Sequence, residues 1–501
     1  MKAIGHSISR AANNRLPNHG DTRIAAWERY EVGTMDEISL NPQMFRAYDI
    51  RGNASTDLTP RISERIGLAY GTYLQRTYAS QQSVVGRDNR LSSEALRDAF
   101  VRGLRATGVS VVDIGLSPSP LLYYAAVQWG IDGGVNVTAS HLPPEFNGFK
   151  LLERNGIPLG PQEIQALVPI AETEDFAVGN GALEHRDPVP EYLEMLTSRF
   201  RLPRPLRVVA DPGNGVAAIT GPEALRRIGC EVITINDELD GTFPAHVPNP
   251  QHPEAMDMLR DEVVRQQADL GVAWDADGDR LGVIDEHGTR HESDRVLAVY
   301  AEDLLTRHPN ARIYVDVKIS QSATDAIREH GGQPYMGPTG HSLVKRIMRD
   351  ETLILGGEGS GHIFFGENYY GFDDAVFGAC MLAQIVARDE RPLSTYFSAH
   401  RDYVTSPEFR LPCPDEAKVM ISNAIAERFR SEYPVLEVDG ARIDFGDGWA
   451  LVRPANTGPE LSVRIEAQTT ERFNLIKGRI IDALRAHPEV DLGASELDSI
   501  S

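Results

Sequence analysis

Three stretches of the chain share one alternation of apolar and polar positions. Each begins with a short apolar run, passes through a turn into a segment with apolar residues at three- and four-residue spacing, and ends in a second apolar run. The stretches are Ser83–Gly115, Leu206–Asp237 and Ala311–Gly337. Apolar runs that alternate with amphipathic segments predict strands joined by helices, and therefore parallel sheets.

The helix of the first stretch has the clearest pattern. Leu96, Phe100 and Leu104 fall at four-residue spacing, Ser92 or Ser93 is placed to cap its start, and Gly108 suits its end. The stretches recur at intervals of roughly 110 residues, which is far longer than a solenoid repeat. The pattern therefore predicts three similar α/β domains.

The C-terminal part departs from this pattern. From about Pro412, a helical stretch precedes residues 437–468, where apolar and polar positions alternate around Asp-Gly turns, and a helical segment at 477–487 follows. Such alternation is typical of an antiparallel sheet. The expected fold class is therefore α/β, with three similar domains of mixed, mostly parallel sheets and a C-terminal α+β domain around a central cleft.

The domain boundaries follow from these patterns and from the polar, aperiodic ends of the chain. Both ends lack the periodicity of packed elements, and the first segment is either disordered or an artefactual extension before an initiator at Met35. We expect an extension at 1–40, domain 1 at 41–190, domain 2 at 191–303, domain 3 at 304–411, domain 4 at 412–490 and a tail at 491–501.

Composition narrows the class of protein. The chain of 501 residues is too long for one core, no apolar run approaches the roughly 20 residues of a membrane span, and the N-terminus lacks a signal-peptide pattern. Three scattered cysteines argue against disulfides or a zinc site. The net charge of −22 disfavours binding to nucleic acid or anionic membranes. We expect a cytoplasmic protein.

The strongest chemical motif follows the apolar run LGVAW. Asp275, Asp277 and Asp279 alternate along the chain, and Gly278 permits a tight turn among them. Three carboxylates are suitable ligands for a hard cation, and a site with an open position suits catalytic Mg²⁺ that also contacts a phosphate. An EF-hand with Glu286 at its twelfth position and a solvated acidic turn are the alternatives.

The other two repeats also end in polar loops. In the first, Ser140 stands beside His141 in a proline-stiffened segment that reaches Lys150. Adjacent side chains do not face each other on regular elements, so a Ser-His-Asp hydrolase is not implied, and a structured surface turn is the alternative. In the third, glycines surround Glu358 and Ser360, a combination suited to binding sugar hydroxyls.

A fourth loop lies in the C-terminal domain. Arg453, Asn456 and Thr457 precede a glycine, and Arg464 follows shortly after. An arginine, an amide and a hydroxyl in one turn favour a phosphate-binding loop, with a plain hairpin turn as the alternative.

Together these loops resemble the α-D-phosphohexomutase superfamily, in particular its bacterial phosphomannomutase/phosphoglucomutase branch. The resemblance runs from about Met44 to His487. Besides the serine loop and the Arg453 loop, it is carried by an ordered set of strings: FRAYDIRG (45–52), ADPGNG (210–215), GTFPAHVPNP (241–250), DADGDR (275–280), DVK (316–318), GHSLVKR (340–346), GEGSGH (357–362) and ENYYGFDDA (367–375).

The resemblance implies an isomerase that interconverts hexose 6-phosphate and hexose 1-phosphate (mannose, glucose or both) through phosphorylated Ser140 and a hexose 1,6-bisphosphate. It implies Mg²⁺ held by Ser140, Asp275, Asp277 and Asp279. Lys150 and Arg51 are implied as the proton-transfer pair, with His341 close by. The implied substrate-binding residues are Tyr48, Arg280, Lys318, Glu358, Ser360, His362, Arg453, Asn456, Thr457 and Arg464.

Three positions depart from the family pattern. Leu142 stands where the family usually has Asn, Ala455 where it usually has Ser, and Gly458 where a larger residue is common. The rival activities are a phosphoglucosamine mutase and a catalytically silent phosphosugar-binding relative. The expected partner is a small phosphosugar, with no nucleic acid or membrane, and a monomer is favoured; the pattern leaves the preferred epimer open.

Overall fold

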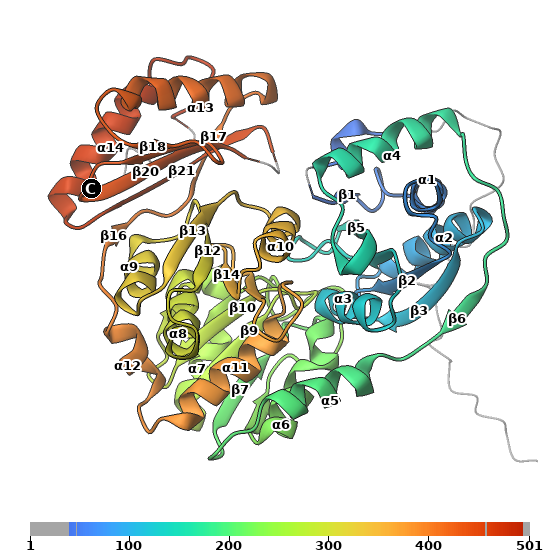
Figure 1. Ribbon diagram of the computed structural model, residues 1–501, viewed down its shortest axis with the longest axis horizontal. Helices are drawn as coiled ribbons and strands as arrows, with labels where there is room; N and C mark the ends of the chain where they lie inside the picture. The colour runs from blue at the N-terminus through green and yellow to red at the C-terminus, as the bar shows by residue number, and fades with distance from the viewer. Residues whose placement is uncertain (1–39, 47, 456–457, 494–501) are drawn as a thin grey trace, which may run out of the picture. The chain divides into compact units, whose positions relative to one another are not determined.

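The protein is described by a computed structural model that covers residues 40–46, 48–455 and 458–493 (Figure 1). The expected extension at 1–40 lies outside these residues except for Leu40, and of the expected tail only residues 491–493 lie inside them. None of the helices in the described part of the chain is long and apolar enough to cross a membrane.

The first sheet has the strand order β1-β5-β4-β2-β3-β6. Strand β2 pairs in parallel with β3 and β4, whereas β5 runs antiparallel to β4 and β1. Its strands are β1 (Ile50–Asn53), β2 (Gln82–Arg87), β3 (Ser110–Leu116), β4 (Gly134–Val137), β5 (Phe146–Leu152) and β6 (Leu183–His185). Its helices are α1 (Pro60–Tyr78), α2 (Ser93–Ala106), α3 (Ser119–Gln128) and α4 (Pro161–Thr173).

Helix α2 confirms the pattern that predicted it. Leu96, Phe100 and Leu104 are buried, and the chain leaves the helix through Gly108, whose φ of +100° is the left-handed conformation that glycine favours. Ser92 occupies the N-cap position without a side-chain capping bond. Its hydroxyl instead accepts a hydrogen bond from Asn147 at 2.8 Å.

The second sheet repeats the central arrangement of the first. Its order is β11-β10-β9-β7-β8, with β7 parallel to β8 and β9, and with β10 antiparallel to β9. The strands are β7 (Arg207–Asp211), β8 (Glu231–Thr234), β9 (Leu270–Trp274), β10 (Leu281–Asp285) and β11 (Arg290–His291). The helices that accompany it are α5 (Val189–Arg199), α6 (Gly221–Ile228) and α7 (Asp257–Gln266).

The third sheet has the same arrangement again, in the order β13-β12-β14-β15. Strand β12 is parallel to both neighbours and β15 is antiparallel to β14. The strands are β12 (Arg312–Asp316), β13 (Gln333–Gly337), β14 (Leu355–Gly357) and β15 (Ile363–Phe365). The helices are α8 (Ser293–Arg307), α9 (Gln321–Glu329), α10 (His341–Asp350), α11 (Ala375–Arg388) and α12 (Leu393–Ser398).

The fourth sheet is antiparallel throughout, as its alternating pattern predicted. Its order is β16-β21-β20-β19-β18, and β17 also pairs with β21. The strands are β16 (Val404–Thr405), β17 (Phe409–Pro412), β18 (Val435–Leu436), β19 (Ala441–Asp444), β20 (Gly448–Pro454) and β21 (Glu460–Ala467), and the helices are α13 (Asp415–Arg430) and α14 (Thr470–Leu484). Helix α14 begins earlier than the apolar pattern indicated because the Thr469 hydroxyl caps it.

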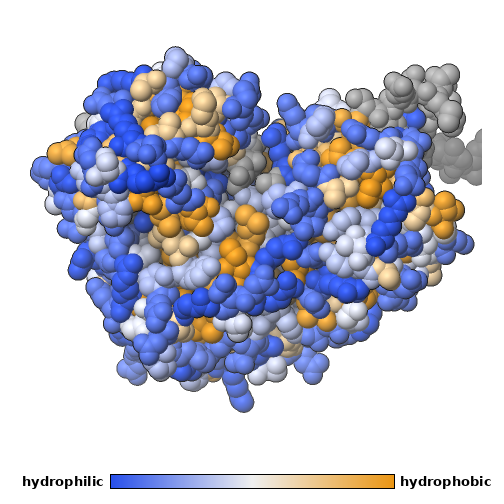
Figure 2. Space-filling view, turned by 45° about the horizontal axis from the view of Figure 1, so that its top comes forward, coloured by the Kyte–Doolittle hydropathy of each residue, from blue (hydrophilic) through white to orange (hydrophobic). Residues whose placement is uncertain are grey.

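The polar loops of the first three sheets occupy equivalent positions. In each of the first three, one loop joins the outer parallel strand to the antiparallel strand beside it, and the loops are β4–β5, β9–β10 and β14–β15. The three sheets share one extended core, whereas the fourth has its own. On the face shown in Figure 2, hydrophobic residues lie in separate groups among hydrophilic ones. The four-domain α/β architecture with mixed sheets is confirmed.

Candidate active site

Ser140 lies in the β4–β5 loop, in a conformation that fixes its direction. It is buried, its φ is +51°, and its backbone N–H donates to the Thr138 hydroxyl at 2.9 Å. Its own hydroxyl donates to Asp275 Oδ2 at 2.8 Å. The loop of the first sheet therefore meets the acidic loop of the second at this hydroxyl.

The side chain of His141 lies beside the Ser140 hydroxyl, although the two residues are adjacent in the chain. Its Nδ1 lies 3.3 Å from the Ser140 hydroxyl, with roles that depend on the tautomer. Burial, together with the positive charges of Arg280 and Arg51, holds the imidazole pKa well below its usual value. The imidazole beside the Ser140 hydroxyl is therefore held in its neutral form.

The three aspartates of the β9–β10 loop form a compact oxygen cluster. Asp275, Asp277 and Asp279 are fully buried, and one carboxylate oxygen from each lies within 4.8 Å of the others. Gly278 adopts a φ of +74° in the turn between them. The Oδ1 atoms of Asp277 and Asp279 have no hydrogen-bond partner among the described residues. Buried, orphaned carboxylate oxygens fit a hard divalent cation.

The EF-hand alternative fails on geometry. Glu286 follows β10, which returns antiparallel to β9, and its carboxylate accepts hydrogen bonds from the Ser394 backbone N–H, at 3.1 Å, and hydroxyl. The twelfth-position carboxylate is therefore engaged elsewhere.

Lys150 enters the acidic cluster from β5. Its ammonium group is buried and donates to Asp277 Oδ2 at 2.6 Å and to Asp279. Burial alone would lower the pKa of Lys150, but the carboxylates of Asp277 and Asp279 raise it well above its usual value. The acidic cluster therefore dominates the surroundings of Lys150 and favours its charged form.

Arg51 approaches from β1, the edge strand that pairs with β5. Its guanidinium binds Asp49 at 2.6 Å. Burial opposes the charged form, yet Asp49 and, more weakly, Asp277 raise the pKa of Arg51 above its usual value. Arg51 therefore stays a cation near the aspartate cluster.

Two histidines of the third sheet belong to a buried polar network. The Arg280 Nε–H donates to His362 Nε2 at 3.2 Å, and His362 Nδ1 lies 2.9 Å from Asp373 Oδ2. Lys345 Nζ lies 2.7 Å from Asp373 Oδ1 and 3.3 Å from His341 Nδ1. Lys345 and Asp373 were not predicted as site residues, although they lie in the strings GHSLVKR and ENYYGFDDA.

The glycine-rich β14–β15 loop presents its polar groups beside α10. Glu358 Oε1 accepts the Gly340 backbone N–H at 2.6 Å, just before His341 begins α10. Nearby, the Tyr48 hydroxyl donates to the Thr339 carbonyl at 2.8 Å. Ser360 is half-buried in the same loop. These groups form a polar surface around the start of α10.

The remaining predicted cations each have a carboxylate partner. Lys318 lies 3.4 Å from Glu408, Arg464 lies 3.6 Å from Asp294, and the Arg453 Nε–H donates to Asp439 at 3.1 Å. The Arg464 guanidinium also donates to the Lys318 carbonyl at 2.8 Å. Asn456 and Thr457 lie outside the described residues.

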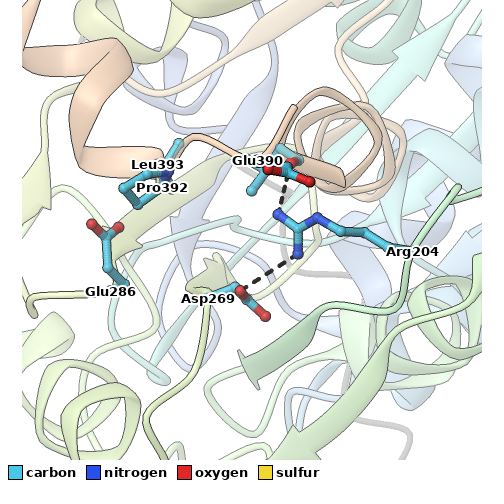
Figure 3. Close-up of a pocket in the computed structure, with 7 residues that line it drawn as sticks. Arg204, Asp269, Glu286, Glu390, Pro392 and Leu393 are labelled. Carbon is cyan, nitrogen blue, oxygen red and sulfur yellow. Dashed lines mark hydrogen bonds and ion pairs between the residues drawn. The ribbon is translucent and has the colours of Figure 1, made fainter. Parts of the chain in front are cut away.

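A separate pocket lies elsewhere in the molecule (Figure 3). Three of its lining residues are acidic, and its one cation, Arg204, lies 3.8 Å from Asp269. None of the predicted site residues lines it. Its mainly negative charge disfavours a phosphosugar, so it is not the candidate active site.

Comparison with known proteins is consistent with this geometry. Four segments match the four domains of phosphoglucomutase/phosphomannomutase: alpha/beta/alpha domain I at 42–178, domain II at 190–288, domain III at 292–403 and the C-terminal domain at 408–483. The phosphomannomutase/phosphoglucomutase of Pseudomonas aeruginosa is 39% identical over 91% of this chain and 98% of that protein. The phosphoglucomutase of Neisseria gonorrhoeae is 33% identical over 90% and 99%.

A solved structure extends the comparison to the fold. A phosphoglucomutase/phosphomannomutase family protein from Burkholderia thailandensis superimposes with a TM-score of 0.84 at 36% identity, covering 90% of this chain and 99% of that one. The similarity spans all four sheets and nearly the full length of these relatives. The chain belongs to the phosphoglucomutase/phosphomannomutase family.

Proposed function

We propose that this protein is a phosphohexomutase that interconverts hexose 6-phosphate and hexose 1-phosphate, with mannose, glucose or both as the sugar. One observation carries the proposal: the Ser140 hydroxyl lies 2.8 Å from Asp275, at the edge of a buried three-carboxylate cluster that also binds Lys150. Simple phosphosugar binding would not need a buried serine hydroxyl at a cation-binding cluster.

The reaction conserves phosphate. In the first half, a sugar hydroxyl oxygen bonds to the phosphorus on Ser140, the bond from phosphorus to the serine oxygen breaks, and the hydroxyl proton passes to a protein group. A hexose 1,6-bisphosphate results and turns around. In the second half, Ser140 takes the other phosphoryl group and the proton returns to the sugar oxygen.

The residues divide these tasks. We assign proton transfer at the sugar hydroxyl to Lys150 and Arg51, with His341 close by, because all three lie in the buried network around Ser140 and Asp277. One of the two cations must lose its own proton before it can accept this one, and bound Mg²⁺ would favour that loss by competing for the carboxylates that now stabilise the charge of Lys150. We assign the sugar hydroxyls to Glu358 and Ser360. The non-reacting phosphate is assigned to Arg453, Asn456, Thr457 and Arg464, and Tyr48, Arg280, Lys318 and His362 complete the substrate contacts.

The acidic cluster fits Mg²⁺. Ser140, Asp275, Asp277 and Asp279 would hold it, since all four supply oxygen ligands and two of the carboxylate oxygens lack other partners among the described residues. When bound, the ion would neutralise charge on the transferring phosphoryl group, which is the main requirement of phosphoryl transfer. Hexose 1,6-bisphosphate is the proposed activator.

We keep the expected domain boundaries as proposals: domains at 41–190, 191–303, 304–411 and 412–490. The cytoplasmic location and the monomeric state likewise remain predictions from sequence.

The proposed function is tested by intact mass and by coupled assays. Protein incubated with glucose 1,6-bisphosphate should gain one phosphoryl group and convert mannose 1-phosphate or glucose 1-phosphate to the 6-phosphate. Ser140→Ala should do neither, whereas Ser398→Ala, which removes an exposed hydroxyl on α12, should do both. Turnover of glucosamine 6-phosphate alone would favour the phosphoglucosamine mutase instead. Absence of both phosphate uptake and turnover in the native protein would refute a mutase.

A further inference from the structure

Arg90 is a fully buried arginine that none of the roles above includes. It follows β2 in the string VGRDNR, and its guanidinium makes five hydrogen bonds. Four of them go to backbone carbonyls of the serine loop: Ser140 and Leu142 at 2.6 Å, Pro143 at 2.6 Å and Phe146 at 3.1 Å. The Arg90 guanidinium thus binds the carbonyls of Ser140 and Leu142, on either side of His141. It also binds two carbonyls nearer the end of the loop.

The fifth hydrogen bond fixes the guanidinium itself. Its Nε–H donates to Asp88 Oδ2 at 3.0 Å, and Asp88 also accepts the Arg90 backbone N–H and the Ser93 hydroxyl. Ser93 in turn accepts an amide N–H of Asn147 at 2.9 Å. Through Asn147, the network therefore reaches β5, the strand that directly follows the loop bound by Arg90.

The segment that follows β8 of the second sheet covers the same guanidinium. The Phe243 ring, from the string GTFPAHVPNP, lies 5.1 Å from the Arg90 guanidinium carbon. The neighbouring Asn89 side chain donates to the Asn214 carbonyl at 2.7 Å, in the string ADPGNG. One motif without an assigned role thus packs on the arginine that organises the serine loop, and a second binds its neighbour, Asn89.

The energetics favour a positioning role. Burying a guanidinium is costly unless its donors are satisfied, and here all five N–H groups have acceptors. The gain is a fixed backbone at Ser140, whose left-handed φ is unfavourable for a residue with a side chain. Lysine offers only three donors from one point and cannot reproduce this planar fork.

We propose that Arg90 is the positioning residue for the phosphoryl-carrying serine. It holds the carbonyls of Ser140 and Leu142 so that the serine hydroxyl stays aligned with Asp275, and it contacts neither the phosphoryl group nor the sugar. This role rests on the proposed function. It also explains how the loop keeps its geometry with Leu142 in place of the usual asparagine, because the hold acts on the backbone.

The test compares Arg90→Lys with Arg65→Lys. Arg65 on α1 is the matched control: it is also buried, and its Nε–H donates to the Ala171 carbonyl at 2.6 Å, away from the site. We expect Arg90→Lys to lower kcat by about 100-fold, the cost of slight misalignment at the reacting atoms, with KM changed by less than about threefold. Arg65→Lys should lower thermal stability and leave kcat per folded molecule unchanged.

A second readout separates positioning from loss of folded protein. Each phosphoserine passes its phosphoryl group to sugar or to water, and the ratio of these events does not depend on how much protein is active. We expect the ratio of transfer to sugar over transfer to water to fall at least about tenfold in Arg90→Lys, in the same direction as kcat. Folded Arg90→Lys with a wild-type ratio and kcat would overturn the proposal.

Two further measurements cover the remaining outcomes. If Arg90→Lys does not fold, Ser93→Ala, which loosens Asp88, should shift the same ratio in the same direction, and an unchanged ratio would overturn the proposal. If the wild type shows no mutase activity, the proposed function fails, but amide hydrogen exchange still tests Arg90: faster exchange across residues 140–146 in Arg90→Lys is expected, and wild-type exchange there would contradict the role.

Discussion

The candidate site has a serine end, around Ser140 and the three aspartates, and a distal end, around Arg453 on the fourth sheet. The two ends pair their cations with carboxylates in different ways. At the serine end, Lys150 binds Asp277 and Asp279, which belong to the cluster that fits a metal. At the distal end, Arg453 binds Asp439, which belongs to no such cluster among the described residues. Under the proposed function, the serine-end carboxylates would hold the metal that assists phosphoryl transfer, whereas Asp439 would be a counterion that a substrate phosphate replaces.

The difference follows from the folds that build each end. The serine end lies on loops at the carboxyl ends of parallel strands in the mixed sheets, and its serine and carboxylates are buried. The distal end lies on an antiparallel sheet with its own core, joined to the third domain through Thr339, which donates from its backbone N–H and hydroxyl to Asp439. A separately folded domain can open and close over the substrate.

The largest expected effect tests the serine end. Asp277→Ala should lower kcat at least about a thousandfold at any Mg²⁺ concentration, the scale of losing a preorganised electrostatic group. Steady-state assays over a Mg²⁺ titration measure this. Asp285→Asn is the control, since Asp285 is also a buried aspartate on the same hairpin but pairs with His291. Near-normal activity of Asp277→Ala would refute the metal assignment.

The next effect tests the distal end. Arg453→Met should raise KM for hexose phosphate by about 10- to 100-fold, because a hydrogen bond to a charged group is worth roughly 1.5–3 kcal/mol. The kcat at saturation should change much less. Arg442→Met on the adjacent strand β19 is the matched control, since Arg442 donates to the Val317 carbonyl instead. A fall in kcat without a change in KM would place Arg453 in the transfer step.

Protonation provides a further contrast, between the serine end and the third sheet. Although burial opposes it, Lys150 lowers the pKa of Asp279 to about 2, whereas burial raises the pKa of Asp316, at the end of β12, to about 7. Folded Asp316 thus binds its proton more tightly than the unfolded carboxyl, whose pKa is about 4. The protein should therefore lose stability as pH rises from about 4 to 7, by roughly 2–3 kcal/mol above pH 5.

Asp316→Asn removes this titration. Relative to the wild type, the variant should gain stability between pH 5 and pH 8, and urea unfolding midpoints at the two pH values measure the gain. A constant difference between the two proteins across this range would show that Asp316 does not change its protonation there, contrary to the prediction.

The sequence predicted the fold well because three repeats carry the same strand and helix periodicities. The loops with Ser140, Asp277 and Glu358 could be predicted equally well, because each directly follows an apolar run that marks the end of a strand. Arg90 and Lys345 were missed because their roles depend on residues far away in the chain: Arg90 reaches carbonyls some 50 positions later and Lys345 meets Asp373. Asp439 was interpreted as part of an Asp-Gly turn, and nothing local marks it as the partner of Arg453.

The smallest effect decides whether the distal counterion competes with substrate. Asp439→Asn keeps an oxygen that accepts from Thr339 but removes the charge that pairs with Arg453. If Asp439 only substitutes for phosphate, KM should fall by about two- to fivefold, as expected for an ion pair worth up to about 1 kcal/mol, and kcat should stay the same. The gain should disappear in the Asp439→Asn/Arg453→Met double variant, because the competition requires both charges. A higher KM for Asp439→Asn would instead mean that this carboxylate holds Arg453 in the orientation that binds phosphate, and the two ends of the site would then use their carboxylates alike.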